Sequence, residues 1–362
     1  MVERHLRVKR ALAKTVPDLA VLLAGRAPRF VYGGRRLQGL PVLTYHDVEP
    51  DAFEADLRLL RSGGYRTVGT AAIEAAARGH WRPDGRSVVL TFDDGLRSLT
   101  ETAAPLLAAY GQQAIAFVVS GLVPPRATQT MAGWAELRAA VRAGTLEVGP
   151  HSLWHHHVPV GAGVVGFVTP RTRTDFVADI PVPRVGGGTP APLGLPILAG
   201  APRYTAARAF LPDLEPIARV VELVAAEGPA FFARGDWKRR LRTETVISGR
   251  WESPEEADAA VVEDVRRAVE IVERECPNPA SRHLCYPWYE GDDRTDRLAA
   301  RAGITTVYSG IGAVDRPADA ERPLRLRRLP PDFLHRLPGP GRVSLATLLA
   351  GRARTLARRH LR

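Results

Sequence analysis

Short apolar segments alternate with amphipathic ones along most of this chain from residue 40 on. The segment 51–65 has apolar side chains spaced four and three positions apart, which predicts a helix that ends at Gly63 and Gly64. The apolar segments between such helices have the composition of buried strands. We predict strands at 39–48, 66–70, 87–92, 113–121, 146–152, 281–289 and 304–310, the last of these being the final strand of the chain. Repeated strand–helix units predict an α/β protein with a parallel sheet, either a barrel or a doubly wound sheet.

The alternation fails between residues 158 and 250, where proline and glycine are frequent and no period is visible. A structureless loop of this length is unusual inside a compact domain, so we expect an insertion with some structure of its own. Order resumes at 253–275, where Ser253 and Glu256 have the spacing of a helix capping box. The predicted domains are a basic N-terminal extension, a barrel containing the insertion and a basic C-terminal helix, with the bounds 1–38, 39–340 and 341–362.

Arginine dominates the charge of the chain, which has 50 Lys and Arg residues against 39 Asp and Glu and a net charge of +11. No nucleic-acid-binding motif accompanies this charge, so we do not expect nucleic acid as a partner. The basic ends leave open a peripheral contact with an anionic membrane surface. No apolar run reaches membrane-spanning length and no signal peptide is recognisable, so we expect a cytoplasmic protein, with peripheral contact at the inner membrane face as an alternative. The two cysteines are too few for a disulfide framework.

Polar side chains follow several of the predicted strands at their carboxyl ends. Asp93 and Asp94 stand side by side after the strand at 87–92, and His46 follows the strand at 39–48. Adjacent carboxylates repel each other and are costly to desolvate unless a nearby group needs them. In a barrel, the carboxyl ends of the strands converge on one face, where active sites are built. The repetition of this pattern therefore predicts an active site, although an isolated Asp-Asp-Gly is also common as a turn with a capping residue.

A cluster of histidines follows the predicted strand at 146–152. His151 and His155 are four residues apart, and imidazole is a good ligand for zinc and similar divalent ions. Three protein ligands would leave a position for water, which the ion makes acidic enough to react near neutral pH. With the aspartate pair on the same face, one carboxylate would complete the ligand set and the other would accept a proton. Taken alone, clustered histidines are more often surface residues.

Four motifs occur in the order expected of one family. The segments "LPVLTYHDV", "LTFDDG", "HSLWH" and "YPW" resemble the polysaccharide deacetylases of carbohydrate esterase family 4. The similarity covers residues 40–157 and 253–310, and the insertion lies outside it. The resemblance implies a distorted (β/α)7-type barrel. It also implies a divalent metal, with Zn²⁺ preferred, and a hydrolase that removes N-acetyl groups from a sugar or glycoconjugate substrate.

The same resemblance assigns the metal ligands and the base. Asp94, His151 and His155 correspond to the metal ligands of the family, and Asp93 corresponds to the general base. Ser152 corresponds to a residue that braces the loop and does not bind the ion. His156 and His157 have no counterpart in the motif, and we interpret them as bystanders or supporting groups.

The remaining assignments concern proton delivery and the oxyanion. The backbone N–H of Trp288 corresponds to a donor to the tetrahedral oxyanion. Relatives with a leading "TYH" are circularly permuted, which makes His46 the general acid, with His335 as a rival. Many relatives have an arginine that steadies the base at the position of Cys285. The sequence does not show which arginine, Arg282 or another, replaces it.

Two other functions stay open at this point. An O-acetyl esterase or a deformylase acting on a lipid-linked or small-molecule substrate would use the same groups around the acyl carbon, because specificity lies in the surrounding loops. A barrel without turnover would act as a non-catalytic carbohydrate-binding module. The complete set of acidic and histidine residues favours an enzyme over such a module.

Overall fold

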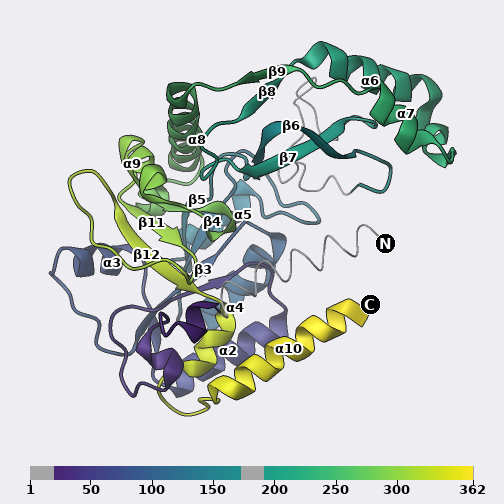
Figure 1. The fold of residues 1–362 in the computed structure, drawn as a ribbon. Coiled ribbons are helices and arrows are strands. Elements are labelled where there is room, and N and C mark those ends of the chain that lie inside the picture. The colour runs from purple at the N-terminus through teal and green to yellow at the C-terminus, as the bar shows by residue number, and fades with distance from the viewer. Residues whose placement is uncertain (1–19, 173–190, 362) are drawn as a thin grey trace. The chain divides into compact units, whose positions relative to one another are not determined.

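The computed structural model describes residues 20–172 and 191–361 (Figure 1). The chain divides into two compact units. The first unit consists of Met1–Leu153, Arg266–Tyr289 and Ala299–Arg362, and the second of Trp154–Val265 and Glu290–Leu298. Of the N-terminal extension expected at 1–38, residues 1–19 lie outside the described part of the chain. Within the described ranges, no helix is both long enough and apolar enough to cross a bilayer.

The first unit is built on a sheet of parallel strands. Seven strands follow one another in the order β10-β11-β12-β1-β3-β4-β5, and β2 pairs with β3. The strands are β1 (Val42–Tyr45), β2 (Arg66–Thr67), β3 (Ser87–Phe92), β4 (Ala114–Val118), β5 (Leu146–Pro150), β10 (His283–Cys285), β11 (Thr306–Ser309) and β12 (Leu324–Leu329). Strand β3 is buried along its whole length, as expected for a parallel strand that is covered on both faces.

The two end strands of this order, β5 and β10, approach each other closely. The side chain of Asn278, just before β10, accepts a hydrogen bond from the backbone N–H of Val148 at 2.9 Å and donates to its carbonyl oxygen at 2.8 Å. A Cβ atom on Gly149 of β5 would lie 2.7 Å from the carbonyl oxygens of Ala280 and His283, so only glycine permits this approach. The sheet is therefore a nearly closed barrel of seven strands, which confirms the predicted (β/α)7-type fold.

Helices and strands share a large apolar cluster in this unit. Helix α2 begins with Pro50 and buries Phe53, Leu57 and Leu60 on one face, as the spacing predicted. Alternate residues of the strands face opposite sides, so Leu43 joins this cluster while its neighbour Val42 joins a second one. The α-helices that lie wholly or partly in this unit are α2 (Pro50–Ser62), α3 (Thr70–Ala77), α4 (Ala104–Ala109), α5 (Trp134–Arg142), α8 (Pro254–Glu275), α9 (Asp293–Arg301) and α10 (Leu345–Leu361).

The structure corrects two predictions near the end of the barrel. The segment 304–310 is not the final strand, because β12 follows it and pairs with both β11 and β1. Three arginines interrupt the apolar pattern of β12, whose sequence is LRLRRL, and this hid the strand. The strand predicted at 281–289 ends at Cys285, and Pro287–Tyr289 form a short 3-10 turn instead. Both differences bear on the site described below.

The second unit has two small antiparallel sheets and its own apolar clusters. Strand β6 pairs with β7, and β8 pairs with β9. Val220 and Val224 of one helix pack with Phe167 of β6 and with Phe231 and Leu241. The elements are β6 (His157–Phe167), β7 (Pro196–Pro202), β8 (Phe210–Pro212), β9 (Gly249–Trp251), α6 (Leu214–Glu227), a 3-10 helix (Gly228–Ala233) and α7 (Trp237–Glu244). The region 158–250, expected as an insertion, therefore contains regular secondary structure on both sides of the undescribed segment 173–190.

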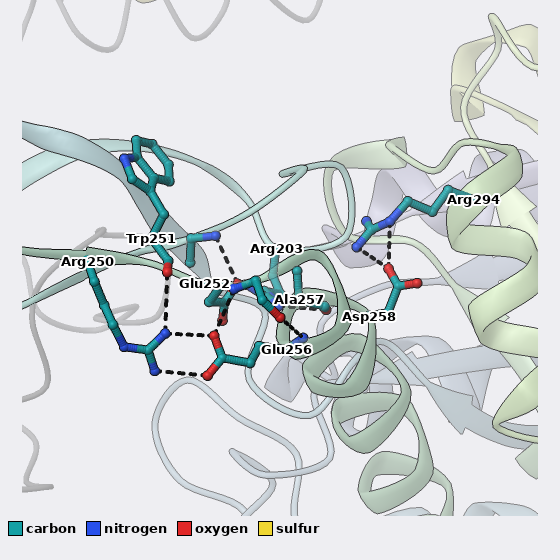
Figure 2. Close-up of polar contacts among 10 residues, drawn as sticks. Arg203, Arg250, Trp251, Glu252, Glu256, Ala257, Asp258 and Arg294 are labelled. Carbon is teal, nitrogen blue, oxygen red and sulfur yellow. Dashed lines mark hydrogen bonds and ion pairs between the residues drawn. The ribbon is translucent and has the colours of Figure 1, made fainter.

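A buried ion pair in this unit joins Arg203, the residue after β7, to Glu252, the residue after β9 (Figure 2). Arg203 Nη1 lies 2.7 Å from Glu252 Oε2, and the same guanidinium donates to the carbonyl oxygen of Ala257. The Ser253 N–H donates to Glu256 and the Glu256 N–H donates to the Ser253 hydroxyl, which confirms the predicted capping box at the start of α8.

Candidate active site

The predicted catalytic groups of the first unit lie at the carboxyl ends of its strands. His46 directly follows β1, Asp93 and Asp94 directly follow β3, and His151 directly follows β5. Parallel pairing of β1 with β3 brings Tyr45 opposite Phe92, so the residues after these two strands lie close together. His46 Nε2 is 3.8 Å from Asp93 Oδ2. The fold therefore brings together side chains that are far apart in the sequence, at the end of the barrel where active sites are built.

The Asp93 carboxylate is buried and bound to an arginine that the sequence did not reveal. Arg328 Nη1 of β12 donates to Asp93 Oδ1 at 2.6 Å, and both side chains are almost completely buried. Burial opposes the charge of Asp93, but Arg328, His151 and His46 outweigh it and hold the pKa of the carboxyl well below its usual range. The carboxylate is therefore ionised, as a proton acceptor must be.

Arg328 lies inside the barrel because of its register on β12. Its strand neighbour Leu326 packs in the apolar cluster that contains Val42, while Leu329 packs in the other cluster, so alternate side chains of β12 face opposite sides. The Arg328 guanidinium lies 4.8 Å from the ring centroid of Tyr289. Burial opposes the charge of Arg328, but Asp93 raises its pKa further above the usual value.

The sequence alone leaves open which arginine steadies the base, with Arg282 as one candidate. Arg282 is exposed and pairs with Glu273 at 3.2 Å, whereas Arg328 is the arginine that pairs with Asp93. Cys285 is buried, with Sγ 3.6 Å from Asp93 Oδ1. A small side chain thus occupies the position where many relatives have arginine, and the guanidinium comes from β12. The signal in the sequence was an arginine at an inward-facing strand position, visible only once β12 is recognised.

His151 is oriented by the backbone of the neighbouring strand. Its Nδ1 lies 2.9 Å from the carbonyl oxygen of Cys285, which accepts a hydrogen bond when Nδ1 carries the proton. The other nitrogen, Nε2, lies 3.6 Å from Asp94 Oδ1. Asp94 and His151 belong to the first unit, and His155, the third predicted ligand, belongs to the second. One carboxylate and two imidazoles form a donor set that suits Zn²⁺ and similar ions, with the histidine tautomer fixed by the backbone as in known metal sites.

Unusual backbone conformations concentrate in the loops of the site. Among the described residues, the non-glycine residues with positive φ are Asp94 (72°), Ser152 (69°), His155 (49°), Trp288 (53°) and Tyr289 (67°). They all follow β3, β5 or β10 within a few residues. Side chains disfavour this region of φ, and the cost is usually accepted only where the surrounding structure and a function require it. The strain supports the predicted position of the site. Ser152 and Trp288, which were predicted to be the brace residue and the oxyanion donor, are among these strained residues.

The two candidate acids have different surroundings. The His46 side chain is 37% exposed, and its ring centroid lies 6.1 Å from that of Tyr289. His335 instead lies 3.3 Å from Asp56, which also accepts a hydrogen bond from the Tyr45 hydroxyl. This hydrogen bond to Asp56 raises the pKa of His335. The geometry favours His46 as the acid, because His46 is the histidine that faces Asp93.

The neighbouring histidines take part in the second unit. His156 Nδ1 lies 4.0 Å from Asp264 Oδ1, and the same carboxylate accepts a hydrogen bond from the Tyr204 hydroxyl at 2.7 Å. His157 is the first residue of β6. Their interpretation as supporting groups or bystanders stays a prediction.

Comparison with family models supports one class of protein, the polysaccharide deacetylases. A model of the family "Polysaccharide deacetylase" matches residues 81–180, a stretch that contains the aspartate pair and the histidine cluster. This match confirms the resemblance predicted from the motifs.

Two individual proteins are similar to parts of this chain. The chain is 28% identical over 158 residues to the poly-beta-1,6-N-acetyl-D-glucosamine N-deacetylase of Escherichia coli (strain K12), a match that covers 36% of this chain and 23% of that protein. It is 30% identical over 88 residues to the putative polysaccharide deacetylase YxkH of Bacillus subtilis (strain 168), covering 22% of this chain and 32% of that protein. The chain thus matches less than a third of the length of either relative.

Solved structures show the same fold. A de-N-acetylase from Aggregatibacter actinomycetemcomitans is similar with a TM-score of 0.51 at 18% identity, over 80% of this chain and 94% of that one. The BpsB deacetylase domain from Bordetella bronchiseptica is similar with a TM-score of 0.50 at 19% identity, over 80% of this chain and 95% of that one. At this level of identity the likeness concerns the barrel fold alone.

Proposed function

We propose that this protein is a divalent-metal-dependent hydrolase that removes an N-acetyl group from an amino sugar in a polysaccharide or glycoconjugate. The observation that carries the proposal is the arrangement at the ends of β3 and β5. A buried, ionised carboxylate held by Arg328 lies directly beside Asp94, a ligand candidate that faces His151. A base next to a metal site is what hydrolysis of an unreactive amide requires.

Asp94, His151 and His155 would hold the ion. Their fit rests on the donor set and on the orientation of His151, whose Nδ1 faces the Cys285 carbonyl oxygen while its Nε2 lies 3.6 Å from Asp94 Oδ1. Bound there, Zn²⁺ or a similar ion supplies Lewis acidity, which polarises the acyl oxygen and lowers the pKa of water.

The other groups move and stabilise charge. Asp93 accepts the proton of the attacking water, and Arg328 keeps the carboxylate charged and oriented toward the reacting centre. His46 is near enough to Asp93, at 3.8 Å, to donate a proton to the departing amine on the same side of the site. The backbone N–H of Trp288 donates to the developing oxyanion. Trp288 has a left-handed backbone conformation, with φ 53°, in the 3-10 turn that follows β10.

The substrate class rests on the relatives. The Escherichia coli relative is named for poly-beta-1,6-N-acetyl-D-glucosamine, and its match includes only part of each chain. An N-acetylated hexosamine is therefore the proposed substrate, and an O-acetyl ester is the alternative to be separated by experiment. The basic C-terminal helix α10 and the basic N-terminal residues are proposed to allow peripheral contact with an anionic membrane surface.

The test combines metal analysis with product analysis. Purified protein is compared with Asp94→Ala and with the control Asp51→Ala, an exposed residue of α2. We expect about one equivalent of ion in the wild type and the control and a large loss in Asp94→Ala. Amine release from an N-acetylglucosamine oligomer should exceed acetate release from an O-acetylated sugar. Wild-type protein that binds no ion and releases no amine with Zn²⁺, Co²⁺ or Mn²⁺ added would overturn the proposal and favour a binding module.

A further inference from the structure

Tyr289 contacts two side chains of the proposed site, although none of the proposed catalytic steps uses it. The Arg328 guanidinium carbon lies 4.8 Å from the centroid of the Tyr289 ring, over its face. The His46 ring centroid lies 6.1 Å from the same point, with the two rings nearly perpendicular at 70°. Both arrangements are attractive, the first between a cation and an aromatic face and the second between two rings. The Tyr289 ring therefore contacts both the arginine that holds the base and the proposed acid.

Tyr289 closes a cluster of four side chains around the base. Arg328 Nη1 donates to Asp93 Oδ1 at 2.6 Å, and His46 Nε2 lies 3.8 Å from the other carboxylate oxygen. The second distance is longer than a hydrogen bond and the His46 side chain is partly exposed, so its contact with Asp93 does not by itself fix the imidazole. Tyr289 supplies a further contact to the imidazole and links it to the guanidinium.

The backbone around Tyr289 holds its ring in place. Tyr289 has a positive φ of 67°. Its N–H donates to the Tyr286 carbonyl oxygen, and its own carbonyl oxygen accepts from the Gly310 N–H, each at 3.2 Å. A Cβ atom on Gly310 would lie 2.6 Å from the Cβ atom of Tyr289, so glycine is needed for this close packing. The whole cluster belongs to the first unit, and a strained residue held on both sides by the chain indicates a ring whose position matters.

We propose that Tyr289 is a positioning residue, whose ring holds the His46 imidazole in the arrangement with Asp93 and Arg328 that proton transfer to the leaving amine needs. Both contacts are made by the ring, so a phenyl ring should replace it and an aliphatic side chain should not. A ring that instead stacked on the sugar would contribute to substrate binding, which kinetics separate from positioning. The effect on turnover rests on the proposed function, whereas the contact between Tyr289 and His46 does not.

The contact is tested by NMR of the full chain, without any measurement of activity. We expect a nuclear Overhauser effect between the ring protons of Tyr289 and His46 in the wild type, with its two signals assigned by their loss in Tyr289→Leu and in His46→Ala. The effect should persist in the control Tyr32→Leu, which removes a tyrosine of the same unit whose hydroxyl donates to the Leu22 carbonyl oxygen. Its absence from the wild type would overturn the proposal.

Turnover separates positioning from substrate binding. For amine release from an N-acetylglucosamine oligomer, we expect kcat of Tyr289→Leu to fall by about 10- to 100-fold with little change in KM, because a misplaced reacting group slows the chemical step. Tyr289→Phe should keep kcat within about twofold of the wild type, and so should Tyr32→Leu. In a His46→Ala background, Tyr289→Leu should lower kcat much less than in the wild type, because the histidine that it positions is gone. Thermal unfolding of each variant confirms that it is folded.

Three kinetic results would contradict the proposal. A rise in KM without a fall in kcat would assign Tyr289 to substrate binding, and an equal loss in Tyr289→Phe would assign the effect to the hydroxyl. Equal losses with and without His46 would show that Tyr289 does not act through this histidine. If the wild type releases no amine, the proposed function fails, while the nuclear Overhauser effect still decides whether Tyr289 holds the imidazole.

Discussion

Arg328 Nη1 lies 2.6 Å from Asp93 Oδ1, although the two residues are 235 positions apart in the sequence and both side chains are buried. The contact joins the ends of β3 and β12 through the interior of the barrel. Arg328 Nε and Nη2 have no hydrogen-bond partner among the described residues, so the ion pair with Asp93 is the main compensation for burying the guanidinium. The relationship connects Arg328 both to the stability of the barrel and to the orientation of Asp93, the proposed base.

Arg328→Met should lower both activity and stability. Removing one partner of a buried pair leaves the other charge uncompensated, which typically costs about 3–5 kcal/mol in the free energy of unfolding. The Asp93 carboxylate also loses its orientation, and we expect kcat to fall by about 100-fold or more while KM changes little. Urea unfolding and steady-state kinetics measure the two effects.

Two further variants separate orientation from stability. Arg328→Lys keeps the charge without the planar fork of the guanidinium, so its unfolding free energy should recover more than its kcat does. Arg325→Met, on the same strand, serves as the control. A kcat near that of the wild type in a folded Arg328→Met protein would show that Arg328 has only a structural role.

The sequence predicted the barrel and the positions of the candidate catalytic residues on its strands, but it did not predict which side chain holds Asp93. Asp93 and His151 follow strands with strong apolar patterns, so both the strands and the positions of these residues were recognisable. Arg328 was missed because β12 reads as a charged segment, and its apolar residues become meaningful only when β11 and β1 lie on either side. The side of a barrel that an arginine faces depends on pairing register, which local sequence does not contain.

The turn after β10 was missed for a related reason. Cys285 and Tyr286 are apolar and favour strand, but Trp288 and Tyr289 adopt positive φ, which only tertiary contacts can impose on such side chains.

His46→Ala should reduce turnover without unfolding the protein. General acid catalysis contributes about 100- to 10,000-fold, so we expect kcat to fall within that range. The side chain is 37% exposed, so the melting temperature should stay close to that of the wild type. Amine release by His46→Ala and His335→Gln is compared directly. Retained activity in the first variant together with loss in the second would transfer the acid role to His335.

His283 should make the stability of the barrel depend on pH. It is fully buried between the Tyr308 hydroxyl and Glu74, and burial lowers its pKa from 6.5 to about 4 despite the neighbouring carboxylate. The unfolded chain binds the proton more readily than the folded one, so this contribution is fully present above pH 6.5. It falls as the pH drops from 6.5 toward 4, by about 3 kcal/mol in total.

Urea unfolding at several pH values between 7 and 4 measures this dependence. The variant His283→Gln keeps a polar side chain but cannot titrate, so its free energy of unfolding should fall less steeply over the same interval. Identical slopes for the two proteins would show that His283 does not titrate differently in the folded and unfolded states.

Two of the ion pairs drawn in Figure 2, Arg203–Glu252 and Arg250–Glu256, should differ strongly in their contribution to the second unit. Arg203 and Glu252 are buried, and Glu252 also accepts a hydrogen bond from the Ala209 N–H at 2.9 Å. Glu252→Gln should therefore destabilise this unit by about 3–5 kcal/mol, because the Arg203 charge stays buried without compensation. Arg250 and Glu256 are exposed, and Arg250→Ala should cost no more than about 1 kcal/mol.

Limited proteolysis and urea unfolding of the full chain compare the two variants. Earlier cleavage within 154–265 in Glu252→Gln, but not in Arg250→Ala, is the expected result, because local opening exposes the chain to protease. If both variants resist cleavage as well as the wild type does, the packing around Arg203 offsets the loss of the ion pair, and the pair does not stabilise this unit.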